Sequence, residues 1–311
     1  MLSLQEIITA TGGHCENMQE LVFTGITTDS RIESSGELFV ALCGERFDGH
    51  AYCKMALEHG AAAVLVSKPV PELPSETVII TVEDTLLAYQ QIAHAYRMSN
   101  KNLKVVAVTG SNGKTTTKDL TAAVLSGKYN VLKTQANFNN EIGLPMTLLQ
   151  LDGSYDVAVV EMGMRGLGQI KELTDIAKPT MGVITNVGET HMELLGSMEN
   201  IAKAKGEMAQ AIEINGNVIL NADDEFVSKM NRLTKAHAIY FGINHAGDIK
   251  AFDIKNQLVQ VLAGFVQVLV GITAAGFDGG VDVVLAGLAQ KGIGKLMLHQ
   301  GFAARQGHAA A

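Results

Sequence analysis

The stretch KVVAVTGSNGKTTTK, from Lys104 to Lys118, decides the fold of this chain. An apolar run at 105–108 leads into a turn that contains Gly110 and Gly113, and a helical pattern follows from Lys118 to Leu125. This order predicts a buried strand, a tight turn and the start of a helix.

The turn has the residue types of a phosphate-binding loop. Glycines let successive backbone N–H groups point at one phosphate, and the positive end of the helix dipole adds to the attraction. Lys114 supplies a charge for the terminal phosphates, and Thr115 offers a hydroxyl to Mg2+. The strict G-x-x-x-x-G-K-[ST] pattern would need glycine at Val108, so this is the shorter T-G-x-x-G-K-T variant. We predict that ATP is bound by Gly110, Ser111, Asn112, Gly113, Lys114, Thr115 and Thr116; an accidental Gly-Lys-Thr in a glycine turn is the alternative.

Composition narrows the class of protein. A chain of 311 residues that is 47% apolar can form about two domains, each with its own core. The net charge of −8 argues against nucleic acid or an anionic membrane as partner. Three scattered cysteines (Cys15, Cys43 and Cys53) suit a reducing cytosol. The N-terminus lacks the basic flank of a signal peptide, and Ser3 with Glu6 predicts a capping box for a helix that ends at Gly12. We therefore expect a cytoplasmic protein.

The first part of the chain, residues 1–100, predicts a small mixed α/β domain. Short strands are expected at 38–42, 62–66 and 78–81, and helices at 51–59 and 84–98. The polar stretch 99–102 is the expected domain boundary. Within this part, Thr28-Asp29-Ser30-Arg31 reads, taken alone, as a capped turn with a solvated arginine.

Residues 101–255 alternate between strands and helices, which predicts a mostly parallel sheet with helices on both faces. After the first strand, the expected strands are 130–133, 156–161, 181–187, 217–221 and 236–241. Ligands of such sheets bind at the carboxyl ends of the strands.

Several polar residues follow these strands. Glu161 stands at the tip of one strand, where a magnesium-binding carboxylate is expected beside a phosphate loop. His191 lies just past the strand at 181–187 and can be structural or a ligand. The stretch Asn221 to Asp224 can bind a base or ribose, or cap the next helix. Lys205 lies on an amphipathic helix, a position that is usually solvated.

The motifs, taken in order, resemble the ATP-dependent Mur ligases of peptidoglycan synthesis. The resemblance covers Met1 to about Lys255, and within the family it is to the branch that joins D-alanyl-D-alanine to UDP-N-acetylmuramoyl-tripeptide. Each motif alone is weak, and the series is specific. The motifs are Thr28 to Arg31, Phe47-Asp48-Gly49-His50, Thr109 to Thr116, Asn137 to Pro145, Glu161 to Gly166 with Gly168, Thr185 to His191, Ala204 to Glu207 and Asn221 to Asp224.

The resemblance implies three domains: one for the UDP-sugar, a central ATPase domain, and a C-terminal Rossmann-like domain that helps to bind the amino substrate. It implies that Asp29, Ser30 and Arg31 contact the uridine nucleotide, and that Asn221 lies near the adenine. A carboxylate on the sugar-linked peptide would attack ATP to give an acyl phosphate, which the amine of D-alanyl-D-alanine would then convert into an amide.

The resemblance also implies a catalytic and metal-binding set. Lys114 would contact the ATP phosphates, while Thr115 and Glu161 would hold one Mg2+ and His191 a second. Lys205 matches the family's carbamylated lysine, and a carbamate turns an ammonium into an oxygen ligand suited to a hard cation. The implied catalytic residues are thus Lys114, His191 and Lys205.

Residues 256–311 depart from the family pattern. From Gln257 onward the chain contains no Ser, Pro, Asn, Glu, Tyr or Cys. This atypical apolar tail resembles out-of-frame translation more than the family's third domain. We therefore expect the tail to pack poorly and the protein to bind ATP and the UDP-sugar but to form little or no ligated product. The uncharged stretch Leu258 to Phe277 has the length of a membrane span, but Gln260, Gln267 and the lack of flanking basic residues disfavour one.

Three other functions remain open at this point. A sister ligase that adds the third amino acid to the same precursor, or folylpolyglutamate synthase, would share the phosphate loop. A non-catalytic remnant would bind ATP and the UDP-sugar without joining anything. The motifs Gly163 to Gly166 and Gly188 to His191 favour the D-alanyl-D-alanine ligase over the two other enzymes, and the non-catalytic remnant stays open.

Overall fold

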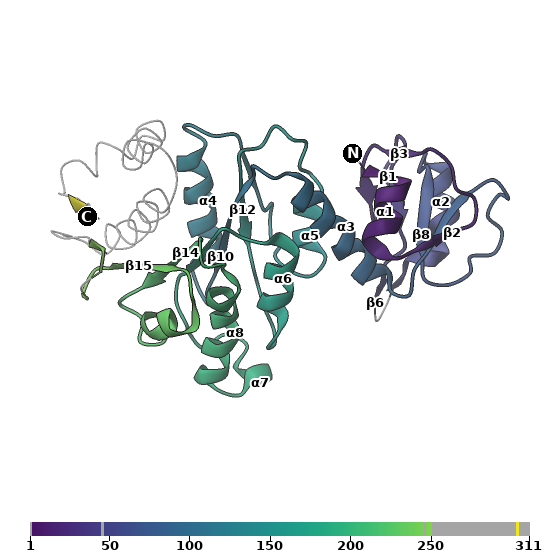
Figure 1. Ribbon diagram of the computed structural model, residues 1–311. Coiled ribbons are helices and arrows are strands. Elements are labelled where there is room, and N and C mark those ends of the chain that lie inside the picture. The colour runs from purple at the N-terminus through teal and green to yellow at the C-terminus, as the bar shows by residue number, and fades with distance from the viewer. Residues whose placement is uncertain (1, 45–46, 246, 251–302, 305–311) are drawn as a thin grey trace. The chain divides into compact units, whose positions relative to one another are not determined.

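The computed structural model describes residues 2–44, 47–245, 247–250 and 303–304. The chain forms two compact units (Figure 1). The first consists of Met1–Lys101 together with Leu148–Asp152, and the second of Asn102–Thr147 and the chain from Gly153 onward. The predicted division of roles between residues 1–100 and 101–255 stays a prediction.

The first unit is built on a five-stranded sheet in the order β2-β9-β8-β5-β4. Strand β2 is antiparallel to β9, and the other neighbours are parallel. Two short antiparallel pairs, β1-β3 and β6-β7, complete its strands. The elements are β1 (Leu2–Ser3), α1 (Leu4–Thr11), β2 (His14–Cys15), β3 (Val22–Phe23), β4 (Ile26–Thr27), β5 (Leu38–Val40), β6 (Cys43–Gly44), β7 (Phe47–Asp48), the 3-10 helix η1 (Gly49–Tyr52), α2 (Cys53–Glu58), β8 (Ala63–Val66), β9 (Val78–Thr81) and α3 (Thr85–Ser99).

Helix α1 begins with the predicted capping box. The Ser3 hydroxyl accepts a hydrogen bond from the Glu6 N–H at 3.2 Å, and the Glu6 carboxylate accepts one from the Ser3 N–H at 2.7 Å. The bonds that the Ser3 N–H and the Ser3 hydroxyl donate to the carboxylate lower the pKa of Glu6. The helix ends at Gly12, whose φ of 65° lies in the left-handed region that glycine adopts without strain. The prediction for this helix is confirmed.

Replacing Ser3 by alanine should lower the free energy of unfolding by about 1 kcal/mol, because the first turn of α1 loses its cap. Denaturant unfolding of the purified protein measures this change. Thr9→Ala is the matched control, since it removes an exposed hydroxyl from the interior of the same helix. An equal loss in both variants would contradict the capping argument.

The second unit is an eight-stranded sheet in the order β11-β12-β10-β13-β14-β15-β16-β17. All neighbours are parallel except β16 and β17, so the predicted mostly parallel sheet is confirmed. The elements are β10 (Lys104–Thr109), α4 (Lys114–Leu125), β11 (Val131–Lys133), α5 (Gly143–Leu148), β12 (Val157–Glu161), α6 (Gln169–Ala177), β13 (Met181–Ile184), α7 (Met192–Leu195), α8 (Met198–Ala211), β14 (Asn217–Asn221), the 3-10 helix η2 (Val227–Leu233), β15 (His237–Gly242), β16 (Ile249–Lys250) and β17 (Ala303–Ala304).

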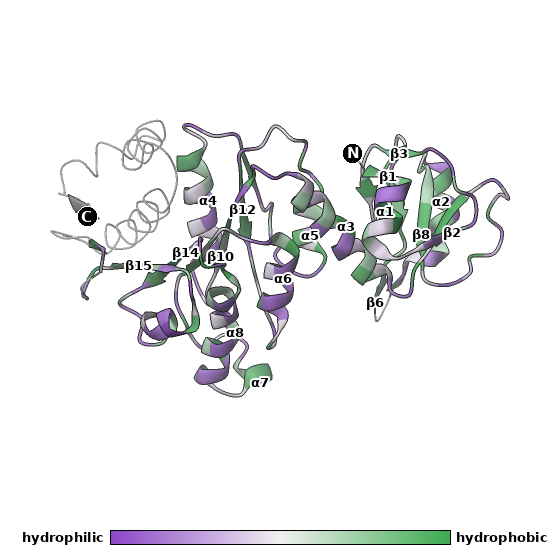
Figure 2. Ribbon diagram, viewed as in Figure 1, coloured by the Kyte–Doolittle hydropathy of each residue, from purple (hydrophilic) through white to green (hydrophobic). Residues whose placement is uncertain are grey.

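Helices cover both faces of this sheet (Figure 1). Val106 and Val108 of β10 pack with Val124 and Leu125 of α4 on one face. On β13, Gly182 points to the other face, where an added Cβ would lie 2.9 Å from Met208 of α8. Successive strand residues face opposite sides, so both faces must be apolar. Figure 2 shows the resulting hydrophobic strands between amphipathic helices.

Strand β10 lies at the point where the strand order reverses. The chain passes from β10 to β11 and β12 on one side, and then returns to β13 on the other. A crevice forms at such a switch point, outside the carboxyl ends of the strands. The loops after β10, β12 and β13 therefore meet there.

Two boundaries beside the phosphate loop differ by three or more residues from the sequence predictions. Strand β13 ends at Ile184 instead of Val187, because Thr185 and Asn186 turn aside to bond the phosphate loop. Helix α4 begins at Lys114, directly after the turn, instead of Lys118. The loop lysine and threonine therefore belong to the first turn of this helix.

No helix in the described part of the chain is long and apolar enough to cross a membrane. The stretch Leu258 to Phe277 and the predictions for the tail at 256–311 lie outside the described residues, apart from the backbone of β17.

Candidate active site

The phosphate loop adopts a conformation that requires its glycines. Gly110 has a φ of 150° and Gly113 a φ of 79°. A Cβ at Gly110 would lie 1.9 Å from the Thr185 hydroxyl oxygen, so no other residue fits there. Gly113 is the N-cap of α4, and no side chain among the described residues caps this helix. The N–H groups of the first turn are thus available to an anionic ligand.

Lys114 folds back over this loop. Its Nζ donates hydrogen bonds to the backbone oxygens of Gly110 at 2.8 Å and Ser111 at 3.2 Å. Burial lowers the pKa of Lys114, and the negative charge of Glu161 opposes that shift. The ammonium is therefore held above the backbone amides, where a phosphate oxygen can replace the carbonyl oxygens as its partner.

Glu161 is brought to the loop by β12, which pairs with β10 in a register that sets Glu161 opposite Val108. The residue is 2% exposed. Its Oε2 accepts a hydrogen bond from the Thr115 hydroxyl at 2.8 Å, and its Oε1 accepts one from the Asn139 amide at 2.8 Å. Hydroxyl, carboxylate and amide oxygens are the ligand types that Mg2+ prefers, so these residues fit that ion.

Lys205 is buried, contrary to the solvated position that its helix pattern indicates. It is 2% exposed, on the inner side of α8 with Ile201, Ala204 and Met208. Burial and, second, the positive charge of Lys114 lower the pKa of Lys205 to about 7. At neutral pH, Lys205 is therefore a neutral, nucleophilic amine in a large fraction of the protein molecules.

His191 is the N-cap of α7 and has the left-handed conformation, with a φ of 58°. Its ring makes no hydrogen bond within the described part of the chain, so it is open to a ligand. The preceding loop docks on the phosphate loop: the Ser111 hydroxyl accepts hydrogen bonds from the Gly188 N–H at 2.8 Å and the Thr190 hydroxyl at 3.0 Å. Ser111 thus anchors the His191 loop, which the sequence did not show.

Polar side chains at and just after the end of β14 bond the protein backbone. The Asn221 amide donates to the Thr185 oxygen at 2.9 Å. Asp224 accepts from the Val187 N–H at 2.9 Å and caps η2 at Phe226 and Val227. The capping alternative therefore describes Asp224, while the predicted place of Asn221 near adenine stays a prediction.

In the first unit, Asp29 and Arg31 form a two-bond ion pair just after β4, at 2.8 and 2.6 Å. This pair holds the pKa of Asp29 at about 2. The Arg31 side chain is 81% exposed and Ser30 is 8% exposed. The turn is thus preformed, with a guanidinium presented to solvent.

A cluster of Cys43, Asp48 and His50 has donor atoms within 4.8 Å of one another. The Ser67 N–H donates to His50 Nε2 at 2.9 Å, so the ring proton is on Nδ1, which lies 2.7 Å from Asp48 Oδ1. A metal on Nδ1 would displace that proton. Lys68 and then His50 hold the pKa of Asp48 well below its usual range. The cluster is a hydrogen-bond network that orders the Phe47 to His50 motif.

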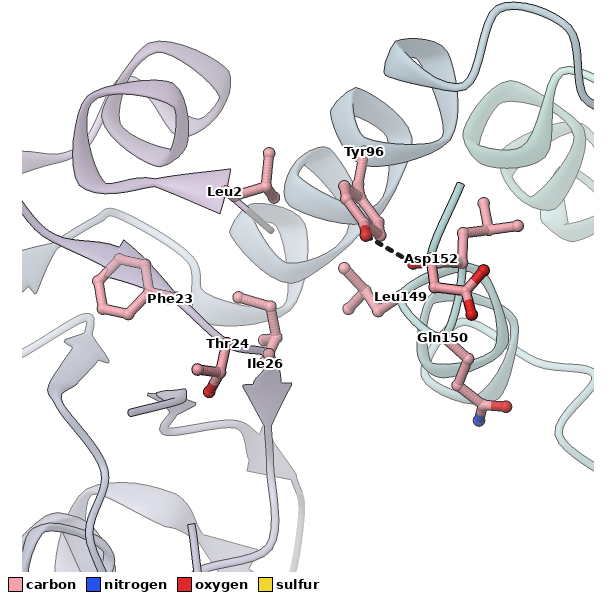
Figure 3. Close-up of a pocket in the computed structure, with 10 residues that line it drawn as sticks. Leu2, Phe23, Thr24, Ile26, Tyr96, Leu149, Gln150 and Asp152 are labelled. Carbon is pink, nitrogen blue, oxygen red and sulfur yellow. Dashed lines mark hydrogen bonds between the residues drawn. The ribbon is translucent and has the colours of Figure 1, made fainter. Parts of the chain in front are cut away.

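A cavity of about 340 Å3 lies within the first unit (Figure 3). Its lining includes none of the predicted site residues. The hydroxyl of Tyr96 on α3 donates a hydrogen bond to the backbone oxygen of Leu151 at 2.5 Å. This bond links two segments that line the cavity. The lining consists of Leu2, Phe23, Thr24, Gly25, Ile26, Tyr96, Leu149, Gln150, Leu151 and Asp152.

Two family descriptions match the chain. The Mur ligase middle domain matches residues 108–275. The catalytic domain of the Mur ligase family matches residues 22–97. The first match extends past Lys255, and neither covers 276–311.

Relatives with known names are similar over the same region. The UDP-N-acetylmuramoyl-tripeptide–D-alanyl-D-alanine ligase of Synechocystis is 48% identical over 232 residues, which is 74% of this chain and 51% of that protein. The crystal structure of MurF from Acinetobacter baumannii has a TM-score of 0.83 at 30% identity, covering 91% of this chain and 66% of that one. MurF from Thermotoga maritima in complex with ADP has a TM-score of 0.69 at 27% identity, covering 92% and 66%. The chain spans about half the length of the curated relatives it matches.

Proposed function

The chain belongs to the Mur ligase family, and we propose that it supplies the UDP-sugar-binding and ATP-binding parts of a ligase that joins D-alanyl-D-alanine to UDP-N-acetylmuramoyl-tripeptide. The observation that carries the proposal is the Glu161 carboxylate held by Thr115 beside an uncapped glycine loop. The names of the relatives from Synechocystis and Bacillus subtilis support the choice of substrates. We further propose a cytoplasmic location and no nucleic-acid partner.

In this proposal the loop from Gly110 to Thr116 holds the phosphates of ATP, with Lys114 at the terminal phosphate. The Thermotoga maritima relative in complex with ADP supports the choice of an adenine nucleotide as ligand. Thr115 and Glu161 would hold Mg2+, with His191 and a carbamylated Lys205 as ligands of a second ion. Bound Mg2+ supplies neutralisation of the phosphate charge.

The reaction has two steps. A carboxylate oxygen of the tripeptide attacks the γ-phosphorus of ATP, and ADP leaves. The amine of D-alanyl-D-alanine then attacks the acyl carbon, phosphate leaves, and the amine loses a proton as the amide forms. The protein's own task is to position these groups and to neutralise charge. Lys114 and the loop amides perform that task at the phosphate.

The sister ligase and folylpolyglutamate synthase differ in the carboxylate that they activate. The Gly163 to Gly166 and Gly188 to His191 motifs favour the tripeptide ligase. A similar structure of the ligase that adds 2,6-diaminopimelate is 18% identical and supports only the common fold.

Arg31→Ala should weaken binding of UDP-N-acetylmuramoyl-tripeptide about 10- to 100-fold, the loss expected for a hydrogen bond to a charged group of about 1.5–3 kcal/mol. Isothermal titration measures this, and the affinity for Mg-ATP should stay within about twofold of the parent because no direct contact is lost. Lys54→Ala removes another exposed cation from the same unit and serves as control. An unchanged affinity for the UDP-sugar would contradict the role of this turn.

A further inference from the structure

Lys118 is a buried lysine whose ammonium lies against a backbone carbonyl. Its side chain is 3% exposed, and its Nζ donates to the Thr134 oxygen at 2.9 Å. The carboxylate of Asp119 is 3.5 Å away, half-exposed, and only 2.6 Å from the Nζ of Lys133. Burying an ammonium in this way costs free energy that a methionine of similar length would not.

The carbonyl that Lys118 holds belongs to a residue fixed at the edge of the active site. Thr134 follows β11 and is fully buried. Its N–H donates to the Val159 oxygen at 3.1 Å, and its hydroxyl accepts from the Glu161 N–H at 3.1 Å. Lys118 therefore acts on the residue that bonds the backbone of Glu161.

The loop that starts at Thr134 returns to the Glu161 side chain. Asn139 donates its amide to Glu161 Oε1 at 2.8 Å, and its carbonyl accepts from the Gly163 N–H at 2.8 Å. The loop is tightly folded: Ala136 has a φ of 44°, and a Cβ at Gly143 would lie 2.4 Å from the Phe138 Cα. A displacement of the Thr134 backbone would therefore also displace Asn139.

Helix α4 therefore reaches both oxygens of Glu161. Thr115 bonds Oε2 directly, and Lys118, three residues later on the same side of the helix, holds the loop that bonds Oε1. Resting on the function proposed above, we propose that Lys118 is a positioning residue, which acts through the Thr134–Asn140 loop to orient Glu161 for Mg2+. Helix α4 then positions both the phosphate loop and the Glu161 carboxylate.

Lys118→Met tests this proposal. The variant should keep or exceed the parent's melting temperature without ligand, because the cost of burying a charge is removed. The Mg2+ concentration that gives half of the stabilisation by ATP should rise about 10-fold or more. Replacing residues that orient metal ligands typically lowers metal affinity by this amount. Thermal unfolding at fixed ATP over a series of Mg2+ concentrations measures both quantities without turnover.

Two comparisons sharpen the result. Lys133→Met removes a positive charge from the same Asp119 without touching the Thr134 carbonyl, and its Mg2+ requirement should match the parent. Asn139→Ala, at a half-buried site, should raise the Mg2+ requirement by itself even if Lys118→Met does not fold. The double variant should be little worse than the more affected single variant, because both act on one path.

An unchanged Mg2+ requirement in Lys118→Met or Asn139→Ala, or additive effects in the double variant, would overturn the proposal and leave the proposed function intact. A parent protein that ATP stabilises equally with and without Mg2+ would instead overturn the metal site, and this proposal with it.

Discussion

Lys114→Ala should abolish the stabilisation of the protein by Mg-ATP. Lys114 is the ammonium that lies over the phosphate loop, bonded to the oxygens of Gly110 and Ser111. At a nucleotide concentration of 100 times Kd, the parent should gain about 2.7 kcal/mol, and the variant should gain almost none of it. Thermal unfolding with and without Mg-ATP measures the difference.

Lys171→Ala is the control for this experiment, since Lys171 is an exposed lysine that pairs with Asp175 on α6. It should respond to Mg-ATP like the parent. If the melting temperature of Lys114→Ala still rises as it does in the parent, the assignment of the phosphate loop is wrong.

Lys205→Ala should eliminate phosphate transfer, and a short carboxylic acid should restore part of it. In the proposed site, a carbamate on Lys205 provides the oxygen ligand, which alanine cannot carry and an added carboxylate can replace. Phosphate release measures the loss and the rescue. Lys203→Ala, on the exposed side of the same helix, should retain activity. Full activity in Lys205→Ala would refute the assignment.

The pH dependence follows from the lowered pKa of Lys205. Only the neutral amine reacts with CO2, and with a pKa of about 7 it becomes the main form above neutral pH. At the same concentration of dissolved CO2, protein stripped of CO2 should therefore regain activity much faster at pH ~8 than at pH ~6. Intact mass at each pH shows whether one CO2 has been added.

The same shift predicts a trend in stability. In the uncarbamylated protein, the pKa of Lys205 is about 7 in the folded state and near 10.5 in the unfolded state. The unfolded state therefore binds more protons between these values, so the contribution of Lys205 to stability rises with pH across this window. Below pH ~7 the cost of charging the buried amine is fully present.

The sequence was sufficient to predict the features that depend on local patterns. The glycine loop, the Ser3 cap and the alternation of strands and helices are local, and the parallel sheet follows from them. Glu161 could be placed because a strand of apolar residues must carry its last side chain to the sheet edge.

Features that depend on tertiary packing could not be predicted. The amphipathic pattern of α8 marks Lys205 as surface, and only the packing of that helix in the folded unit buries it. The same holds for Lys118 and for the hydroxyl of Ser111, whose partners are distant in sequence. Strand β13 was predicted to extend to Val187, but its apolar run ends at Ile184, and the sequence does not reveal that Thr185 turns to the phosphate loop.

Trapping of the activated carboxylate by hydroxylamine tests the central claim most directly. The protein is incubated with Mg-ATP, hydroxylamine and one carboxylate at a time: UDP-N-acetylmuramoyl-tripeptide, the corresponding dipeptide, or a folate. We expect a hydroxamate and an equal amount of ADP with the tripeptide only. Hydroxamate from the dipeptide or the folate would show a sister ligase or a folylpolyglutamate synthase, and binding of ATP and UDP-sugar with no hydroxamate from any of the three would contradict the proposed ligase chemistry.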